Sequence, residues 1–225
     1  MSKNRETEAL QAYLKLLQTK GANSLVLEKR EVFLQKLNET LSVKILDGTE
    51  YREAIEEVME TMPAEGWHEC LTAGREYYPF WMKDFKTIAN LSRNSAFEIE
   101  VSTWKPITAT TLKVLWDSLD SEKFDTSENW PLKAYTQALR FEGAEQSLVD
   151  TRVKLAKLIL VRLRDAPEKS RNHYRTAVDL TLPLFNIKQN RRLFLVVVRE
   201  FYHFWTGNPE AASMVLQDGS GNMLQ

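Results

Sequence analysis

Apolar residues recur every three or four positions along most of the chain, which is the spacing of amphipathic helices. The first such stripe consists of Leu10, Tyr13, Leu14 and Leu17. Three more follow, at Val26, Phe33, Leu37 and Leu41, at Tyr51, Ala54, Ile55, Val58 and Met62, and at Leu71, Gly74, Tyr78 and Trp81. The stripes are separated by Gly21, by Asp47-Gly48, and by Pro63 with Gly66. This pattern predicts four helices.

The same landmarks return later in the chain. The heptad R-E-Y-Y-P-F-W at 75–81 recurs as R-E-F-Y-H-F-W at 199–205. Three further blocks match in the same order: Leu10-Gln-Ala-Tyr13 with Leu132-Lys-Ala-Tyr135, Ser24-Leu25-Val26 with Ser147-Leu148-Val149, and Tyr51-Arg52 with Tyr174-Arg175. The offset rises from 122 to 124 residues along the chain, as small loop insertions after a duplication would produce. Residues of about 5–95 and 128–215 are therefore expected to be two copies of one unit.

We expect an all-α fold of two tandem, related four-helix bundles joined by a helical connector. The expected boundaries are 1–97 for the first unit, 98–130 for the connector, 131–217 for the second unit and 218–225 for a flexible tail. The connector has a short apolar stripe at Leu112, Leu115, Trp116 and Leu119. Residues 125–129 are expected to form a loop, and Pro131 to begin the next helix.

Composition points to an ordinary globular protein, with 43% hydrophobic and 27% charged residues among 225. The chain has no apolar run of the roughly 18 residues that span a bilayer, and its start lacks the apolar core of a signal peptide. The single cysteine, Cys70, excludes an intrachain disulfide and suits a reducing compartment. These features predict a cytoplasmic protein with no membrane contact.

Catalytic signals are poor. The three histidines are His68, His173 and His203, and the second heptad's His203 is replaced by Pro79 in the first. His68 and Cys70 point to different faces of a predicted helix and have no partner pair for zinc. The chain also lacks a glycine-rich phosphate loop and the common hydrolase motifs. We expect no catalysis, no cofactor and no metal.

Charge is balanced overall at −1, but residues from 126 onward carry 14 Lys and Arg against 10 Asp and Glu. The basic residues of the second unit fall mainly on its second helix and at the start of its fourth. Those that we expect to contact phosphates are Arg152, Lys154, Lys157, Arg171, Lys188, Arg191 and Arg192, with Arg199 bracing the fourth helix. The alternative is an ordinary solvated surface.

The repeated unit resembles the SAM-like core-binding domain at the front of tyrosine recombinases, the phage integrases and Xer-type enzymes. Similar landmarks open each copy, as Tyr13, Gly21 and Ser24 and as Tyr135, Gly143 and Ser147. The fourth helix is matched by Leu71-x-x-x-Arg75-x-Tyr77-Tyr78 and by Leu195-x-x-x-Arg199-x-Phe201-Tyr202. Only the second copy has the family's basic lead-in, Arg191-Arg192, and its trailing Asn208-Pro209.

The family's catalytic domain has no counterpart in this chain. The resemblance therefore implies a module that clamps duplex DNA without cutting it, mainly through the second unit. The rival interpretation is a helical protein-interaction scaffold, in which exposed aromatic residues dock a partner or a second copy. A third is a small-molecule pocket between the units, lined by Trp104, Trp116 and Trp130. Convergence of the second unit's cations on one face favours DNA, whereas interspersed acidic side chains favour the scaffold.

Overall fold

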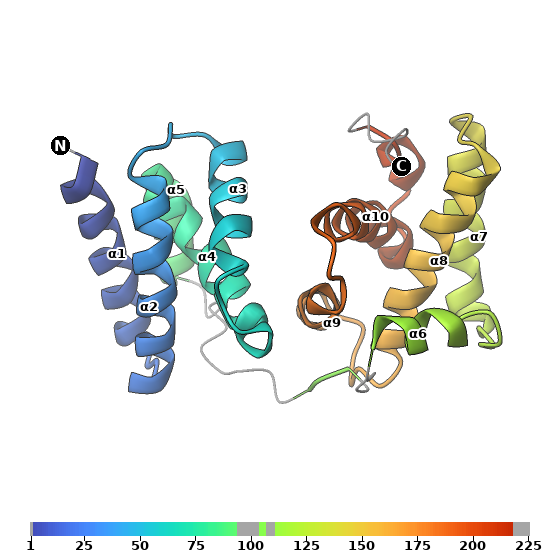
Figure 1. The fold of residues 1–225 in the computed structure, drawn as a ribbon, viewed down its shortest axis with the longest axis horizontal. Coiled ribbons are helices and arrows are strands. Elements are labelled where there is room, and N and C mark those ends of the chain that lie inside the picture. The colour runs from blue at the N-terminus through green and yellow to red at the C-terminus, as the bar shows by residue number, and fades with distance from the viewer. Residues whose placement is uncertain (1, 94–103, 107–110, 218–225) are drawn as a thin grey trace. The chain divides into compact units, whose positions relative to one another are not determined.

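The computed structural model describes residues 2–93, 104–106 and 111–217. These residues form ten α-helices with short 3-10 segments and, within the described ranges, no strand (Figure 1). The all-α prediction is confirmed. The chain divides into two compact units, Met1–Thr103 and Trp104–Gln225, and each is described here by itself.

The described residues of the first unit form five helices. They are α1 (Ser2–Thr19), α2 (Ser24–Leu41), α3 (Gly48–Met59), α4 (Trp67–Met82) and α5 (Phe85–Arg93), with a 3-10 turn, η1 (Ala64–Gly66), before α4. Gly21 has the positive φ of 91° that the sequence predicts at the end of the first helix. Asn23 and Asp47 accept backbone hydrogen bonds at the starts of α2 and α3. The short α5, which packs on α4, was not predicted.

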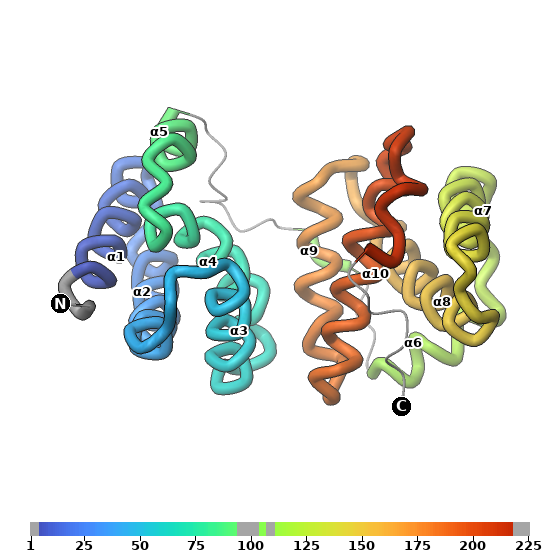
Figure 2. The backbone as a smooth tube through the Cα atoms, turned by 90° about the horizontal axis from the view of Figure 1, so that it is seen from above, coloured from blue at the N-terminus to red at the C-terminus, as the bar shows by residue number. Residues whose placement is uncertain are grey.

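The second unit contains α6 (Leu112–Ser118), α7 (Thr126–Phe141), α8 (Gln146–Leu163), α9 (Arg171–Thr181) and α10 (Lys188–Thr206). Two 3-10 segments complete it, η2 (Leu182–Leu184) and η3 (Ala211–Met214). Helices α7 and α8 lie side by side in both views (Figures 1 and 2). Helix α6 packs against α8, so the described part of the predicted connector belongs to this unit.

The predicted loop at 125–129 is wrong, because α7 already begins at Thr126. Asp125 accepts a hydrogen bond from the backbone N–H of Glu128, whose carboxylate accepts one from the N–H of Asp125. This reciprocal capping box starts the helix five residues before Pro131. Pro131 therefore lies in the second turn of α7, where it has no N–H to donate to the carbonyl oxygen of Ser127 four residues earlier.

Residues matched by the repeat make the same contacts in each unit. Tyr51 donates a hydrogen bond to the carbonyl oxygen of Gly74 at 2.7 Å. In the second unit Tyr174 donates to the carbonyl oxygen of Val198, also at 2.7 Å. The ring pairs agree too: Tyr51–Trp81 and Tyr174–Trp205 both have centroids 5.0 Å apart. The recurring aromatic residues therefore pack against one another in the same way within each unit.

Candidate functional site

Arg152, the first residue expected to touch phosphate, lies in the core of the second unit with none of its surface exposed. Its Nη1 is 2.6 Å from Oε2 of Glu200, and the hydroxyl of Tyr135 donates to the same oxygen at 2.6 Å. Burial opposes the charge on Arg152, but Glu200 and Tyr135 together outweigh it, and the pKa of Arg152 is raised. A guanidinium held here does not reach the surface, so Arg152 is removed from the predicted DNA contacts.

Lys154 and Lys157 lie on α8 under the segment that precedes α7. The Nζ atom of Lys154 is 2.9 Å from both carboxylate oxygens of Asp120 and 5.0 Å from the ring centroid of Trp116. Lys157 Nζ lies 5.6 Å from the ring of Phe124. The basic strip predicted along α8 is therefore interspersed with acidic and aromatic side chains of its own unit.

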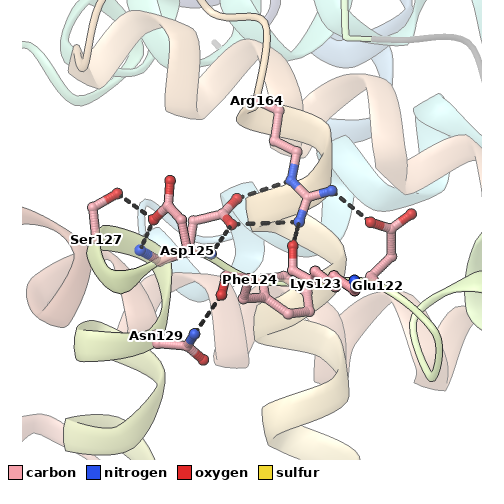
Figure 3. A network of polar contacts seen from close by, with 8 residues as sticks. Glu122, Lys123, Phe124, Asp125, Ser127, Asn129 and Arg164 are labelled. Carbon is pink, nitrogen blue, oxygen red and sulfur yellow. Dashed lines mark hydrogen bonds and ion pairs between the residues drawn. The ribbon is translucent and has the colours of Figure 1, made fainter.

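Arg164, just past the end of α8, also pairs with residues of the segment that precedes α7. Figure 3 shows its guanidinium between Glu122 and the segment that leads into α7. Its Nη1 lies 2.6 Å from Glu122, its Nε lies 2.9 Å from Glu128, and its Nη2 donates to the carbonyl oxygen of Lys123 at 2.9 Å. The hydrogen bonds that the guanidinium donates to these carboxylates, that of Glu128 first, raise the pKa of Arg164. The arginine fastens residues 122–128 to α8.

The other four predicted contacts do not converge on one place. Lys188, Arg191 and Arg192 occupy the first turns of α10, whose first turn has no acidic residue. Lys188 and Arg192 are exposed, while Arg191 is half-buried and donates to the carbonyl oxygen of Phe185 at 2.7 Å. Arg171 begins α9, whose other end leads into α10, so the length of an 11-residue helix, about 16 Å, separates it from the others.

Arg199, which we expect to brace the fourth helix, lies on the exposed face of α10. It lines a small depression of about 300 Å³ together with His203 and Met214.

A larger groove, of about 660 Å³, lies between α7 and the segment that follows α10. Trp130 and Phe141 border it on α7, and their side chains are 64% and 90% exposed. Pro209 and Ala212 line the opposite wall. Large aromatic rings exposed at the border of a groove are candidates for contact with a partner, because such rings are enriched at protein interfaces. The groove, referred to below as the α7 groove, is the second candidate site.

The far wall of the α7 groove is held by the same carboxylate that pairs with Arg152. Oε1 of Glu200 accepts a hydrogen bond from the backbone N–H of Leu216 at 2.9 Å. Ala211, the first residue of η3, and Val215, the residue after its end, are both buried at 4% exposure. The residues after α10 are therefore packed against the rest of the second unit, and they form the fixed far wall of the α7 groove.

The three tryptophans proposed to line one small-molecule pocket lie in different surroundings. Trp104 packs edge-on against His173, with ring centroids 5.1 Å apart. Trp116 lies under Lys154, and Trp130 borders the α7 groove. Of these three tryptophans, only Trp130 lines the α7 groove, and none lines the depression beside Arg199.

Among the described residues, no three His, Cys, Asp or Glu side chains come together in a way that could hold a metal ion. The thiol of Cys70 is buried, and this burial raises its pKa to about 11. Within the same part of the chain, no helix combines the length and apolar character needed to cross a bilayer.

Comparison of the chain with protein-family models, with curated proteins and with solved structures finds no match in any of the three. The candidate sites therefore rest on the geometry of this chain alone.

Proposed function

We propose that this protein is a non-catalytic protein-interaction module that binds a partner polypeptide in the α7 groove of its second unit. The observation that carries the proposal is the exposure of Trp130 and Phe141 on the border of one apolar groove. Aromatic side chains of this kind dominate the binding energy of protein interfaces, because they bury a large area at a small cost in side-chain entropy. The sole cysteine suits a reducing compartment, so we propose the cytoplasm as the location.

The charges of the second unit support this proposal over DNA binding. Acidic residues pair with the cations of α8 and its end, as Asp120 does with Lys154 and Glu122 with Arg164. Interspersed carboxylates weaken the attraction of a surface for the phosphate backbone, whose affinity depends on the number of phosphates neutralised. A protein partner needs no such excess of positive charge.

A photo-crosslinking experiment tests the proposed function. Benzoylphenylalanine is placed at position 141, and as a control at position 85, because Phe85 is also 73% exposed but belongs to the first unit. We expect a discrete adduct from position 141 only, and we expect Ala212→Arg, which fills the opposite wall, to abolish it. The purified partner should then bind the intact chain, and Trp130→Ala should weaken that binding about thirtyfold. An adduct that survives Ala212→Arg, or none beyond the control, contradicts the proposal.

DNA binding is the second candidate, favoured by the three cations in the first turns of α10 and by the resemblance to recombinase core-binding domains. Lys188 and Arg192 are exposed there. If they contact phosphates, the affinity for a duplex should fall steeply with salt, and a Lys188→Glu/Arg192→Glu variant should weaken binding to all sequences alike. Fluorescence anisotropy with a labelled duplex at two salt concentrations measures this. Binding that is absent at low salt rules it out.

A further inference from the structure

The α7 groove follows one face of α7. Trp130, Ala134, Ala138 and Phe141 all line it, at helical spacings of four, four and three residues. This stripe runs for about 16 Å, or three helical turns. Aromatic residues stand at its two ends and alanines lie between them. The groove is therefore open in the middle and bounded at both ends by large rings.

The opposite wall is built from small residues as well. Gly207, Ala212 and Ser213 contribute to it together with Pro209. Small side chains on both walls allow a partner backbone to approach closely, because the distance between packed helices depends on the side chains at the contact. The stripe thus has the length of a short helix, and the small residues opposite it favour the close approach of one.

An extended partner fits this groove less well than a helix. Strand addition needs a sheet edge with unpaired backbone N–H and C=O groups. The described residues contain no strand, and the walls of the α7 groove come from α7, the end of α10 and η3. A polypeptide whose own backbone hydrogen bonds are satisfied internally is therefore the suitable occupant.

The charged residues beside the groove indicate which charge the partner should carry on the side chains next to them. Lys133 and Arg140 are exposed on α7, seven residues apart and next to the stripe on its solvent side. Neither forms an ion pair with a residue in the described ranges; Arg140 contacts only Oε1 of Gln146, at 3.5 Å. Glu142, at the end of α7, is the one charged residue that lines the groove itself. An acidic flank on the partner would face the two cations.

We infer that the α7 groove binds an amphipathic helix of about three turns, with its apolar stripe between Trp130 and Phe141 and carboxylates beside Lys133 and Arg140. This inference rests on the proposed function and specifies the chemistry of the partner. The partner helix places apolar side chains at positions i, i+3, i+4 and i+7 against the groove. The two cations select its charge and contribute less to its affinity.

Two designed peptides test the inference with the full chain. Each has 14 residues, a leucine stripe at helical spacing and a fluorescein label; one carries glutamates on its flanks and the other lysines. We expect the glutamate peptide to bind roughly ten times more tightly than the lysine peptide at low salt. Lys133 and Arg140 would form two exposed ion pairs with its glutamates, whereas they would repel the lysines of the other peptide. Lys133→Glu/Arg140→Glu should reverse this preference. Trp130→Ala/Phe141→Ala should weaken the binding of both peptides.

The other outcomes overturn the inference in distinguishable ways. If both peptides bind equally and Lys133→Glu/Arg140→Glu changes nothing, the assigned charge is wrong although the groove still binds helices. If neither peptide binds, the helical partner is wrong, and crosslinking from position 141 decides separately whether the groove binds protein at all. If sedimentation velocity shows a dimer that Trp130→Ala/Phe141→Ala abolishes, the groove is occupied by a second copy of this chain. Circular dichroism of each variant confirms that it is folded.

Discussion

Arg152 and Glu200 form an ion pair in the core of the second unit, with Nη1 and Oε2 2.6 Å apart and the arginine fully buried. Arg30 and Glu76 form the corresponding pair in the first unit, at 2.5 Å. The two arginines differ in one respect. Arg30 also pairs through Nε with Glu69 at 2.6 Å, whereas the position matching Glu69 in the second unit is Leu193.

This difference predicts that the two carboxylates contribute unequally to stability. Glu200→Gln leaves the buried Arg152 facing a neutral amide and weakens the hydrogen bonds of Tyr135 and Leu216, so we expect a loss of about 3–5 kcal/mol in the second unit. Glu76→Gln is the matched control and should cost less, because Arg30 keeps Glu69. Native-state hydrogen exchange of α8 and α2 amides measures each unit separately.

The surface pair Lys154–Asp120 supplies a second control. Lys154→Ala should cost no more than about 1 kcal/mol, because the carboxylate of Asp120 is exposed to solvent.

Equal effects of Glu200→Gln and Glu76→Gln would show that the extra carboxylate of Glu69 has no energetic role.

The burial of Arg152 could have been predicted from the repeat. Helices α2 and α8 align at an offset of 122, which places Arg152 opposite Arg30, whereas the Ser24–Ser147 match at 123 would place Val153 there; Glu200 matches Glu76 at 124. Arg152 also lies three residues after Val149, on the apolar stripe of its own helix. The basic residues around it favour a surface strip, whereas its position on the apolar stripe favours burial. A charged residue on the buried face with a matching carboxylate in both copies is the signal that was missed.

The α7 groove could be predicted only in part. Asp125-Thr-Ser-Glu128 has the spacing of a capping box, and reading it as such would have extended α7 back past Trp130. The opposite wall depends on how residues 209–215 fold back after α10, which no periodicity in that short segment reveals. The stripes of the other helices and Gly21 were predictable because each depends only on local spacing or backbone conformation.

The capping box makes the start of α7 sensitive to acid. Backbone hydrogen bonds to the carboxylate of Asp125, from the N–H of Glu128 first, hold its pKa below the usual value. The folded state therefore binds this proton less readily than the unfolded state does. The stabilisation is complete above the unfolded pKa, about 4, and is lost as the pH falls through the lower folded pKa.

We expect the first-turn amides of α7 to lose protection as the pH falls below about 4. Asp125→Asn is the matched control, because asparagine also caps helices but does not titrate. Residue 125 cannot ionise in this variant, so the first-turn amides of α7 should not show the loss of protection that protonation of Asp125 causes. NMR titration of the Asp125 carboxyl carbon measures the pKa directly; a midpoint at the ordinary value for an exposed aspartate contradicts the prediction.

At the end of α4 a change to glycine is predicted to stabilise the helix, and at the end of α10 a change from glycine is predicted to destabilise it. Lys83 and Gly207, which correspond in the repeat, both follow a helix in the left-handed region, with φ of 57° and 74°. A side chain with a Cβ is disfavoured there by about 1–2 kcal/mol. Lys83→Gly should therefore stabilise α4 by less than about 1 kcal/mol, because glycine also loosens the unfolded chain.

Gly207→Ala should destabilise the end of α10 by roughly 1 kcal/mol. Gly66 provides the control, because it has a φ of −90° and open space where a Cβ would be added. Gly66→Ala should not destabilise α4. Hydrogen exchange at the last turn of each helix reports these changes, and a stabilising Gly207→Ala would contradict the role assigned to the left-handed backbone.

Gly74 and Ile55 should be energetically coupled in the core of the first unit. A Cβ added at Gly74 would lie 2.9 Å from Cδ1 of Ile55, the end of a flexible side chain. In the second unit the matching residues are Val198 and Val178, a larger residue facing a shorter one. Alanine is favoured over glycine inside a helix by about 1 kcal/mol. In the unaltered chain this gain is offset because Ile55 must move.

Ile55→Val removes Cδ1, the atom that an added Cβ would meet first, so Gly74→Ala should be more favourable in that background than alone. We expect a coupling of at least about 0.5 kcal/mol between the two substitutions. A double-mutant cycle read from the exchange of α4 amides measures it, with Ile55→Val alone accounting for the lost methyl group. Additive effects would mean that Ile55 relocates at no cost, and that the size difference between the two units does not reflect complementary packing.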